Sequence, residues 1–402
     1  MARIVVAKNR LPWPSHTGTD VATFNLLRAL AGRHDVTFVS LVTGPVAAEA
    51  CAAFERAGVR LVPVMMPNKG SWPRRVIFKV FYTAASWFTG TPRDLWYYNP
   101  PAFKRAVVTA AAGADLLQCE YWYLFPTADA VAGVRKVLLA HDAEFNANRR
   151  QVAAAGTPWR RLWNGLTYLR RRDFERYACG RFDRVVCLSA ADAALLAPSC
   201  RRPPAVCFPL VDLPPATAVS GRGDGRTLVY FGGTSRFANH HGLERFLREI
   251  YPLIQRHIGN VRFVIKGERP RPSVRRIIDG DASIAWTRPG DDLGAELAAA
   301  AVAIVPVWVG AGIKIKILTA LSYGVPVVTT AVGAEGIPAG AEDGMEVADT
   351  AEGFATAVAA LLRDENLWRR RAVGARRFAE NELAFEKRAP AAAALYDELA
   401  AS

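Results

Sequence analysis

The chain alternates between two kinds of segment from one end to the other. Short apolar runs such as RIVVAKN (3–9) and DVTFVSLV (35–42) have the composition of buried strands, and an amphipathic stretch with helical spacing, TGTDVATFNLLRALAGR (17–33), lies between them. Strands separated by helices form parallel sheets, because a parallel neighbour is reached only through a crossover connection. The alternation therefore predicts the α/β class, built from open, doubly wound parallel sheets.

A break in this pattern divides the chain into two similar halves. The segment VDLPPATAVSGRGDGR (211–226) is rich in Pro, Gly and Ser and has no hydrophobic periodicity, as expected of a linker. After it the alternation restarts with TLVYFGG (227–233) and ends in a helical tail at 353–402. We predict two Rossmann-like domains, at 1–212 and 213–384, that face each other across a cleft lined by their strand ends.

The composition sets limits on location and cofactors. Of the 402 residues, 51% are hydrophobic and 22% charged, which is typical of a globular chain. The first residues, MARIVVAKNRLPWP, contain too short an apolar stretch for a signal peptide, and the longest apolar run, 297–313, is shorter than the ~20 residues of a membrane span. The six cysteines form no close pair, so we expect neither disulfides nor a zinc site. These features favour a cytoplasmic location.

The positive charge is concentrated in one segment. The net charge is +14, and ten arginines lie between Arg149 and Arg184. Such a patch attracts phosphates, acidic membranes or nucleic acid, and it is equally compatible with a solvated helix face. No recognised nucleic-acid-binding module accompanies it, so we expect no nucleic-acid partner.

A glycine-rich turn is the strongest functional signal. In VPVWVGAGIKIKILTALSYG (305–324) a strand ends near Trp308, a turn with Gly310 and Gly312 follows, and a helix begins near Lys314. Backbone N–H groups at a helix N-terminus form a ready site for a diphosphate, to which lysines add positive charge. The alternative is an ordinary buried strand–helix turn.

Two other turns have the same construction. YFGGTSRFANHHG (230–242) places Gly232 and Gly233 after a strand, with Thr234 and Arg236 following and a helix expected to begin near Gly242. Near the start of the chain, Gly18 precedes the first helix. Each turn is weak evidence alone, but two glycine-rich turns in one domain could hold a diphosphate from two sides.

The order of these elements resembles the retaining glycosyltransferases of GT-B fold, specifically glycosyltransferase family 4. The resemblance covers most of the chain, and these segments carry it: WPSHTGTDVATFNLLRAL (13–30), FGGTSRFANHHGLERFLREIYPLI (231–254), FVIKGERP (263–270) and VPVWVGAGIKIKILTALSYGVPVVTTAVGAEGI (305–337). It implies that a nucleotide-diphosphate sugar is the co-substrate, that no cofactor is tightly bound, and that the C-terminal helix (385–402) returns to the first domain.

The resemblance also assigns roles on the donor side. The amides of Gly312, Ile313 and Lys314 would hold the sugar and diphosphate, while Lys316 and Arg236 would neutralise phosphate charge. The backbone of AWTR (285–288) would lie over the base; its residues are Trp286, Thr287 and Arg288.

Two acidic positions of the family pattern are changed in this chain. The glutamate that binds ribose hydroxyls falls at Thr319, and the first acid of the turn falls at Ala311. A threonine can make only one good acceptor contact with a diol that a carboxylate would hold twice. No metal is implied, because the only candidate acidic motif, Gly290 to Asp292, has the composition of a helix N-cap.

The acceptor side is predicted to lie at strand ends of the first domain. Glu120 ends the strand LLQCE, and His141 and Asp142 follow the strand KVLLA. A histidine beside carboxylates can orient an acceptor hydroxyl or handle its proton, so these three residues are the catalytic candidates. A structural, hydrogen-bonded histidine is the alternative.

Several functions stay open at this point. SWPRRVIFKVFYTAASWFTG (71–90) has an apolar stripe flanked by basic residues, which is compatible either with peripheral membrane contact, and so with a lipid-linked acceptor, or with core packing. A small-molecule or glycan acceptor is equally compatible. The alternatives to a transferase are a sugar-nucleotide epimerase and a non-catalytic module that binds a partner or a membrane through its basic surface.

Overall fold

The chain forms two compact units in a computed structural model that describes residues 1–15, 17–66, 72–215, 221–234, 236–268, 270–288 and 293–401. The first unit contains residues 1–15, 23–208 and 389–402. The second contains the described residues of 16–22 and residues 209–388. The last helix of the chain thus ends in the first unit, although most of the preceding residues belong to the second.

The first unit is built on a seven-stranded sheet with the order β3-β2-β1-β4-β5-β6-β7, in which all neighbours are parallel. Its strands are β1 (Arg3–Lys8), β2 (Asp35–Val42), β3 (Val59–Met65), β4 (Leu116–Glu120), β5 (Arg135–Ala140), β6 (Arg184–Cys187) and β7 (Ala205–Val206). The order reverses direction between β1 and β4, so the ends of these two strands flank a crevice where ligands bind in such sheets.

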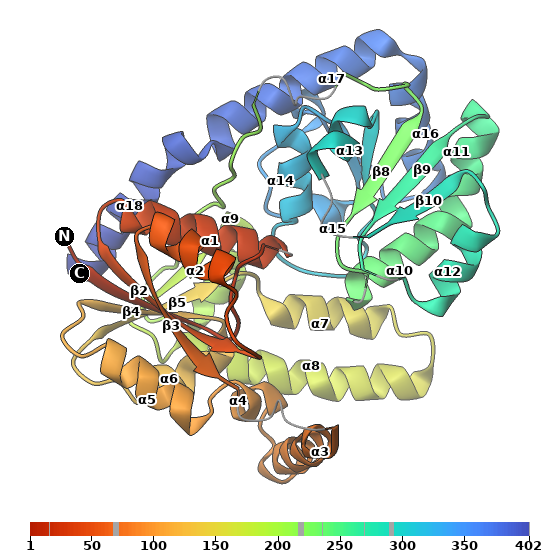
Figure 1. Cartoon of the computed structure of the whole chain (residues 1–402). Helices are drawn as coiled ribbons and strands as arrows, with labels where there is room; N and C mark the ends of the chain where they lie inside the picture. Colours follow the sequence, from red (N-terminus) through yellow and green to blue (C-terminus); the bar gives the residue numbers. More distant parts are fainter. Residues whose placement is uncertain are drawn as a thin grey trace. The chain divides into compact units, whose positions relative to one another are not determined.

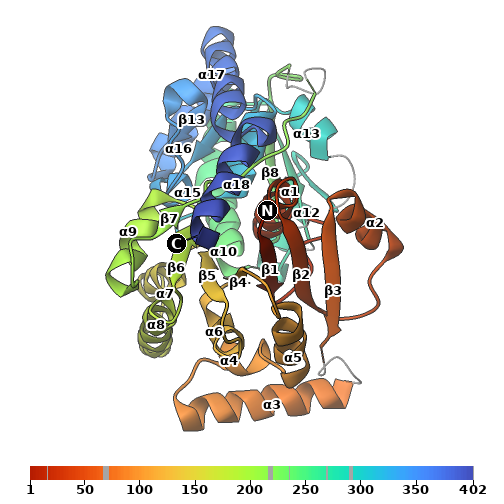
Figure 2. The same cartoon turned by 90° about the vertical axis from the view of Figure 1, so that its left-hand side faces the viewer.

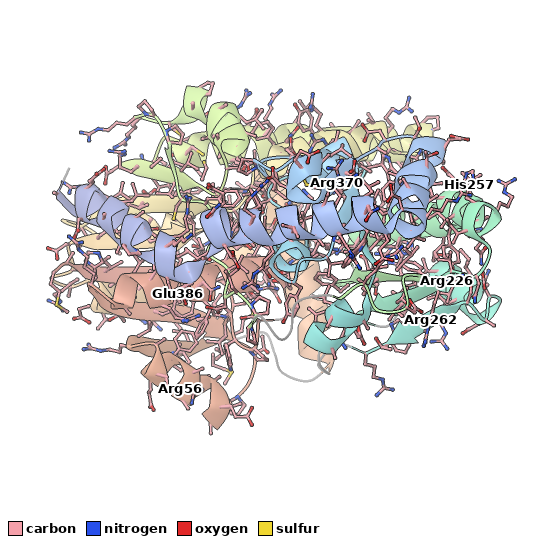
Figure 3. All side chains as sticks on the ribbon, turned by 90° about the horizontal axis from the view of Figure 1, so that it is seen from above. Arg56, Arg226, His257, Arg262, Arg370 and Glu386 are labelled. Carbon is pink, nitrogen blue, oxygen red and sulfur yellow. The ribbon has the colours of Figure 1, made fainter. Side chains whose placement is uncertain are left out.

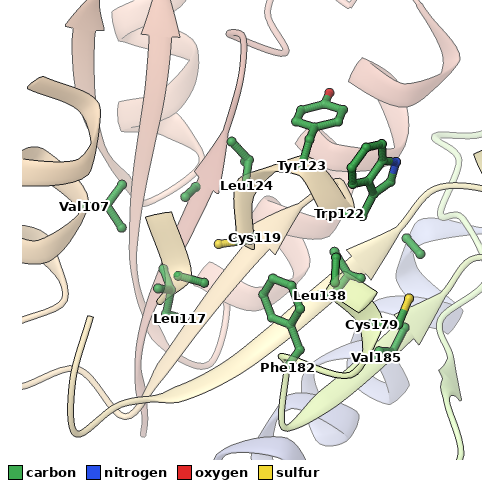
Figure 4. Close-up of a cluster of buried hydrophobic side chains, with 14 of the residues drawn as sticks. Val107, Leu117, Cys119, Trp122, Tyr123, Leu124, Leu138, Cys179, Phe182 and Val185 are labelled. Atoms are coloured by element: carbon green, nitrogen blue, oxygen red, sulfur yellow. The ribbon is translucent and has the colours of Figure 1, made fainter. Parts of the chain in front are cut away.

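Helices cover both faces of this sheet (Figure 1). They are α1 (Gly18–Ala31), α2 (Ala48–Arg56), α3 (Trp72–Thr89), α4 (Arg93–Tyr97), α5 (Pro101–Ala110), α6 (Phe125–Ala128), α7 (Glu144–Ala153), α8 (Pro158–Cys179), α9 (Ala190–Leu196) and α18 (Phe385–Ala401). Side chains alternate between the faces of a strand. In β4, Leu117 and Cys119 therefore join the core that includes Val107 of α5 (Figure 4), whereas Gln118 accepts a hydrogen bond from the Tyr396 hydroxyl of α18 on the other face.

The second unit repeats the design with a six-stranded parallel sheet in the order β10-β9-β8-β11-β12-β13, of which Figure 1 labels β8, β9 and β10. Its strands are β8 (Thr227–Phe231), β9 (Arg262–Lys266), β10 (Ile284–Thr287), β11 (Val302–Val305), β12 (Val327–Thr329) and β13 (Met345–Val347). Here the order reverses between β8 and β11.

The helices of the second unit pack around an aromatic core with Phe246 and Phe263 in contact at its centre, 5.1 Å apart. They are α10 (Phe237–Arg245), α11 (Tyr251–Ile258), α12 (Pro272–Asp279), α13 (Leu293–Ala299), α14 (Ile315–Ser322), α15 (Ala331–Ala334), α16 (Ala351–Arg363) and α17 (Glu365–Phe378). Charged side chains such as Arg370 on α17 and Glu386 on α18 project into solvent (Figure 3).

The predicted fold class is confirmed, but two local predictions were wrong. The helix expected near Gly242 begins at Phe237, and Gly242 lies inside it. This position is a glycine because a Cβ there would come within 1.7 Å of the Pro306 carbonyl oxygen. The run PVVTTAVG (326–333) predicts a strand throughout, but β12 ends at Thr329, since Thr330 caps the short helix α15 by accepting a hydrogen bond from the Gly333 amide.

Other predictions concern what the chain lacks. Within the described ranges, no helix is long and apolar enough to cross a membrane, and no group of three or more His, Cys, Asp or Glu side chains is placed to hold a metal. All six cysteines are free thiols. The acidic motif 290–292 lies outside the described residues.

Candidate functional site

The two glycine-rich turns of the second unit follow the two strands at its switch point. Gly232 and Gly233 come directly after β8, and the turn at 310–314 connects β11 to α14. β8 and β11 are neighbours in the sheet, so their carboxyl ends bring the turns together at one edge. The predicted pairing of the turns is therefore a consequence of strand order.

The turn that contains Gly232 and Gly233 leaves a space beside Lys316 that a side chain at residue 232 would fill. Gly232 has a φ of 136°, and a Cβ at this position would lie 2.8 Å from the Lys316 Nζ. The Gly233 carbonyl accepts a hydrogen bond from the Asn239 side chain at 2.7 Å, and the Thr234 hydroxyl donates to the Glu268 carbonyl at 2.7 Å. The turn is thus held from both sides, and its backbone faces the Lys316 ammonium with no side chain between.

The second turn is held by one of its own lysines. Gly310 and Gly312 have φ angles of 154° and 70°, conformations that favour glycine. The Lys314 ammonium donates hydrogen bonds to the carbonyls of Ala311 at 3.0 Å and Gly312 at 2.5 Å. These bonds draw the carbonyls to one side of the turn. Ile313 is half-buried in the same turn.

Lys316 is the cation aimed at the opening. Its ammonium lies 3.2 Å from the Asn239 Oδ1 and 4.6 Å from the centre of the Tyr230 ring, and no carboxylate of the described residues lies within 4 Å. Burial, together with the positive charges of Lys314 and Arg236, lowers the pKa of Lys316 from 10.5 to about 7. An anion placed here would supply the missing counter-charge.

Asn239 and Tyr230 were missed by the sequence reasoning. Asn239 bridges the first turn and Lys316, because its amide donates to Gly233 and its oxygen accepts from the ammonium. Its position in the first turn of α10, six residues after Gly233, was the available signal. Tyr230 looks like any buried strand residue, so nothing in the sequence distinguishes it.

The predicted base-binding segment lies on the edge strand β10, with β9 between it and the glycine turn of β8. Trp286 donates to the Gly267 carbonyl at 3.1 Å, and Thr287 donates to Glu296 at 3.2 Å. Arg288 is exposed. These residues share the carboxyl edge of the sheet with the turns but do not contact Lys316.

Two further donor-side candidates lie near the start of α14. Thr319 donates its hydroxyl to the Ile315 carbonyl at 3.1 Å, which leaves its oxygen as a single acceptor group. Residues 17–22 group with the second unit, and a Cβ at Gly18 would lie 2.8 Å from the Ile315 Cβ.

Arg236, the other predicted phosphate-binding cation, is exposed and is the N-cap residue of α10.

In the first unit, the strand ends at the switch point bring together a buried charged network. Lys8 ends β1 and Glu120 ends β4; their ammonium and carboxylate form an ion pair at 2.8 Å with no exposed surface on either side chain. The Thr23 hydroxyl of α1 donates to the same carboxylate at 2.6 Å. The His141 Nε2 lies 2.9 Å from it. Of the predicted catalytic residues, Glu120 and His141 are thus in direct contact.

Charge keeps Glu120 ionised in spite of its burial. Desolvation raises the pKa of its carboxyl, but the Lys8 charge and the His141 hydrogen bond outweigh it, so the pKa falls to about 2. An ionised carboxylate only accepts hydrogen bonds, so the Nε2 of His141 must carry the proton that it donates to Glu120. The network therefore sets the tautomer and orientation of the imidazole.

A cluster of aromatic side chains packs beside this network. Tyr121, directly after Glu120, has a φ of 78°, which is strained for a residue other than glycine. Its ring lies 4.8 Å from the His141 ring and 5.2 Å from that of Tyr123. Such strain is kept where the surroundings require it, and here it brings an aromatic face against the imidazole.

Asp142 and His141 line a small cavity together with Tyr121, Glu144 and Glu175. Glu175 accepts hydrogen bonds from the amides of Glu144 and Phe145 at 3.0 and 2.8 Å. Burial, with the charges of Glu144 and Asp142, raises the pKa of Glu175 well above its usual range, which favours the neutral acid. Sequence reasoning missed Lys8, Thr23 and Glu175, because they come from a strand and helices that carry no motif.

Two family models match the sequence and together span most of both units. One, described as a glycosyl transferase 4-like domain, matches residues 17–210, and the other, glycosyl transferases group 1, matches residues 225–364. A comparison with curated proteins found no match.

Several solved structures share the fold over the whole chain. A sucrose-phosphate synthase from Thermosynechococcus elongatus is 17% identical with a TM-score of 0.73, and each chain is covered in full. HepE from Anabaena, solved with UDP-glucose, is 13% identical with a TM-score of 0.68, covering 99% of this chain and 100% of that one. A S. aureus TarM variant, solved with Fondaparinux, alpha-GlcNAc-glycerol and UDP, is 10% identical with a TM-score of 0.71 and full coverage of both chains.

Proposed function

This chain belongs to the GT-B glycosyltransferases of the family-4 type, and we propose that it moves a sugar from a nucleotide-diphosphate sugar to an acceptor hydroxyl with retention of configuration. The observation that carries the proposal is the Lys316 ammonium, which faces the open Gly232 turn without a carboxylate partner among the described residues. UDP-sugars are the first donors to test, because two of the similar structures hold UDP or UDP-glucose.

The proposed donor chemistry is electrostatic. The Gly312 and Ile313 amides and the Lys316 ammonium bind the diphosphate and stabilise the charge that develops as it leaves. Lys314 contributes by holding the turn in shape. Thr319 offers one acceptor to the ribose, so the donor is held mainly through its phosphates. Hexose transfer without a metal ion is part of this proposal.

The proposed bond changes follow from retention. The anomeric carbon–oxygen bond to the diphosphate breaks, and a bond to the acceptor oxygen forms on the same face of the sugar. The acceptor proton passes to the departing phosphate oxygen, so no side chain has to remove it. His141, held by Glu120, is proposed to orient the sugar or acceptor hydroxyl, with Asp142 beside it.

A nucleotide panel tests the donor proposal. Thermal unfolding measured with UDP, GDP, ADP, CDP and dTDP should show stabilisation by one of them, worth ~2.7 kcal/mol at a hundredfold excess over its dissociation constant. The control is Gly232→Ala, whose added methyl displaces the Lys316 ammonium and should remove the shift. No stabilisation by any nucleotide would contradict the proposal and favour a non-catalytic module.

Product analysis separates the remaining alternatives. An epimerase would convert the sugar nucleotide into an isomer without any acceptor, whereas a transferase releases the nucleoside diphosphate. The anomeric coupling constant of the glycoside formed by NMR then reports retention or inversion.

We also propose that the first unit docks on an anionic membrane surface, because α8 presents apolar side chains away from the core. Trp159, Leu162, Trp163 and Leu166 are 73%, 55%, 48% and 47% exposed. They lie at helical spacing, on the side opposite the buried Glu175, Ala178 and Cys179. Figure 1 and Figure 2 both show α3 and α8 in the lower part of the first unit. Phe81 and Phe88 of α3 are also exposed.

The charges beside the stripe favour acidic lipid over a neutral surface. Arg160 and Arg161 lie on α8 and Arg149 on α7, and none has a carboxylate partner among the described residues. An apolar stripe flanked by basic residues is typical of helices that lie in a membrane interface. The free thiols are compatible with the cytoplasmic side of such a membrane. Val76 and Val80 of the same α3 stripe are 41% and 62% exposed, whereas the side chains of Ile77 and Trp87 lie outside what is described.

Vesicle co-sedimentation tests the docking proposal. The triple variant Trp159→Ser, Leu162→Ser, Leu166→Ser should bind phosphatidylglycerol-containing vesicles at least about tenfold more weakly, because each buried apolar side chain contributes ~1.5–3 kcal/mol when fully covered. Val373→Ser on α17, whose valine is 68% exposed, is the matched control and should bind normally. Equal binding by the triple variant, or equal binding to phosphatidylcholine vesicles, would refute the proposal.

A further inference from the structure

A basic cavity lies at the opposite edge of the first sheet from His141, where β5 and β6 begin. Its volume is about 670 Å³, and its lining residues come from the segments 129–136, 181–184 and 201–202. Six of these side chains are cationic and two are acidic. It shares no residue with the sites described above, so it needs an explanation of its own.

Half of the cations are already engaged by the protein. Arg135 donates to the carbonyls of Leu399 and Ala400 at the end of α18. Arg181 pairs with Asp129 at 3.1 Å, and Arg201 lies 3.5 Å from Asp183. Both carboxylates of the cavity are therefore used, and these contacts shape its wall.

The other three cations have no counter-charge. Lys136, Arg184 and Arg202 have no carboxylate within 4 Å among the residues that the structure describes. The Arg184 Nε is also buried, and it finds no hydrogen-bond acceptor in the described part of the chain. A buried donor without an acceptor is rare in native proteins, because it loses its hydration without a replacement.

The backbone around these cations is fixed. The Asp183 carboxylate accepts the Lys136 amide at 2.9 Å, and Asp183 directly precedes Arg184 in β6. Lys136 lies on the neighbouring strand β5, paired in register with β6. In this register Arg184 pairs with Val137, so the Arg184 and Lys136 side chains leave opposite faces of the sheet, and both line the cavity at the edge where the strands begin. The adjacent, hydrogen-bonded strands give both residues a rigid base.

We propose that this cavity binds a phosphate-bearing anion, held by Arg184, Lys136 and Arg202. Phosphate carries more than one negative charge and several acceptor oxygens, which suits a guanidinium fork with further cations beside it. The buried Arg184 Nε would gain the acceptor that it lacks. The site is independent of the proposed donor site, so its ligand would be a second one, either a free phosphorylated molecule or a lipid headgroup.

Titration calorimetry with inorganic pyrophosphate tests the site in the Lys316→Met background, in which the proposed donor site is weakened. Pyrophosphate should bind this variant, and Arg184→Gln or Lys136→Gln added to it should weaken binding at least about tenfold. Arg56→Gln on α2, an exposed arginine outside the cavity (Figure 3), is the matched control and should leave binding unchanged. Thermal unfolding of each variant checks that it folds.

The outcomes are distinct from those of the donor proposal. Loss of pyrophosphate binding in Lys316→Met alone, or equal binding with and without Arg184→Gln, would overturn the second site. An equal loss in Arg56→Gln would also overturn it, because it would indicate general surface charge. To separate the two sources, vesicle binding through α8 is first weakened with Trp159→Ser, Leu162→Ser, Leu166→Ser, and phosphatidic-acid vesicles are tested in that background. Residual vesicle binding that Arg184→Gln removes identifies a headgroup, and vesicle binding that Arg184→Gln leaves unchanged identifies a free phosphorylated molecule.

Discussion

Lys316→Met should weaken binding of the nucleoside diphosphate by about 10- to 100-fold, as expected for loss of one charged hydrogen bond to phosphate. Its ammonium is the group that faces the Gly232 turn. Because the pKa of Lys316 is about 7 in the free protein, the ammonium has largely lost its proton at pH 8. A bound diphosphate raises that pKa, so binding at pH 8 should take up close to one proton.

Calorimetry in buffers of different ionisation enthalpy, such as HEPES and Tris, measures this proton uptake. Lys316→Arg is the informative control, because a guanidinium stays charged at all relevant pH values. It should bind without proton uptake and with less dependence on pH between 7 and 9. Unchanged uptake in Lys316→Met would assign the proton to another group and contradict the role of Lys316.

The thermal stability of Lys316→Met shows whether its weaker nucleotide binding comes from the lost ammonium or from misfolding. The folded state lowers the pKa of Lys316, so the unfolded chain binds more protons between about pH 7 and 10.5. This group therefore disfavours folding below that range, and its contribution to stability improves as the pH rises through it. Lys316→Met should unfold at an equal or higher temperature than the wild type at pH 7, although it binds nucleotide poorly.

Glu120→Ala should destabilise the first unit by ~3–5 kcal/mol, the usual effect of removing one partner of a buried ion pair. Both Glu120 and Lys8 are fully buried, so the Lys8 ammonium would lose its carboxylate without access to water. Transfer activity should also fall, because His141 loses the acceptor that sets its tautomer. Urea unfolding followed by a probe in the first unit measures the stability change.

A double-variant cycle shows whether the loss of stability comes from the Lys8 charge that Glu120→Ala leaves buried without a counter-charge. Lys8→Met with Glu120→Gln removes both charges, so it should be less destabilised than the sum of the two single variants. Additive effects would contradict a coupled pair. Since the pKa of Glu120 falls from 4.5 to about 2 on folding, its contribution to stability is complete above about pH 4.5 and is lost as the pH falls to about 2.

The fold was predictable because its signal is periodic. Each strand in both sheets is a short apolar run separated from the next by a helix, and parallel pairing follows from that spacing. Helix boundaries were less predictable: Gly242 looked like the start of a helix, yet contact with the Pro306 carbonyl explains this glycine inside α10. Such contacts join residues far apart in the chain, so no local pattern reports them.

The candidate sites divide in the same way. Lys316 and the glycines around it were identifiable because they form one contiguous motif after a strand. Asn239, Lys8 and Thr23 were not, since each reaches its site from a different element. Their role appears only when the strand order is known.

The fold class, the two glycine-rich turns and the strand ends that carry Glu120 and His141 could be predicted from the sequence, because hydrophobic periodicity and glycine placement are local properties. Which charges are compensated depends on the tertiary structure. Lys8 and Glu120 neutralise each other in a buried pair, whereas Lys316 and Arg184 lie without a carboxylate within 4 Å among the described residues. The physical reason is that desolvation and pairing depend on distances between side chains from separate strands, and these distances exist only in the folded chain.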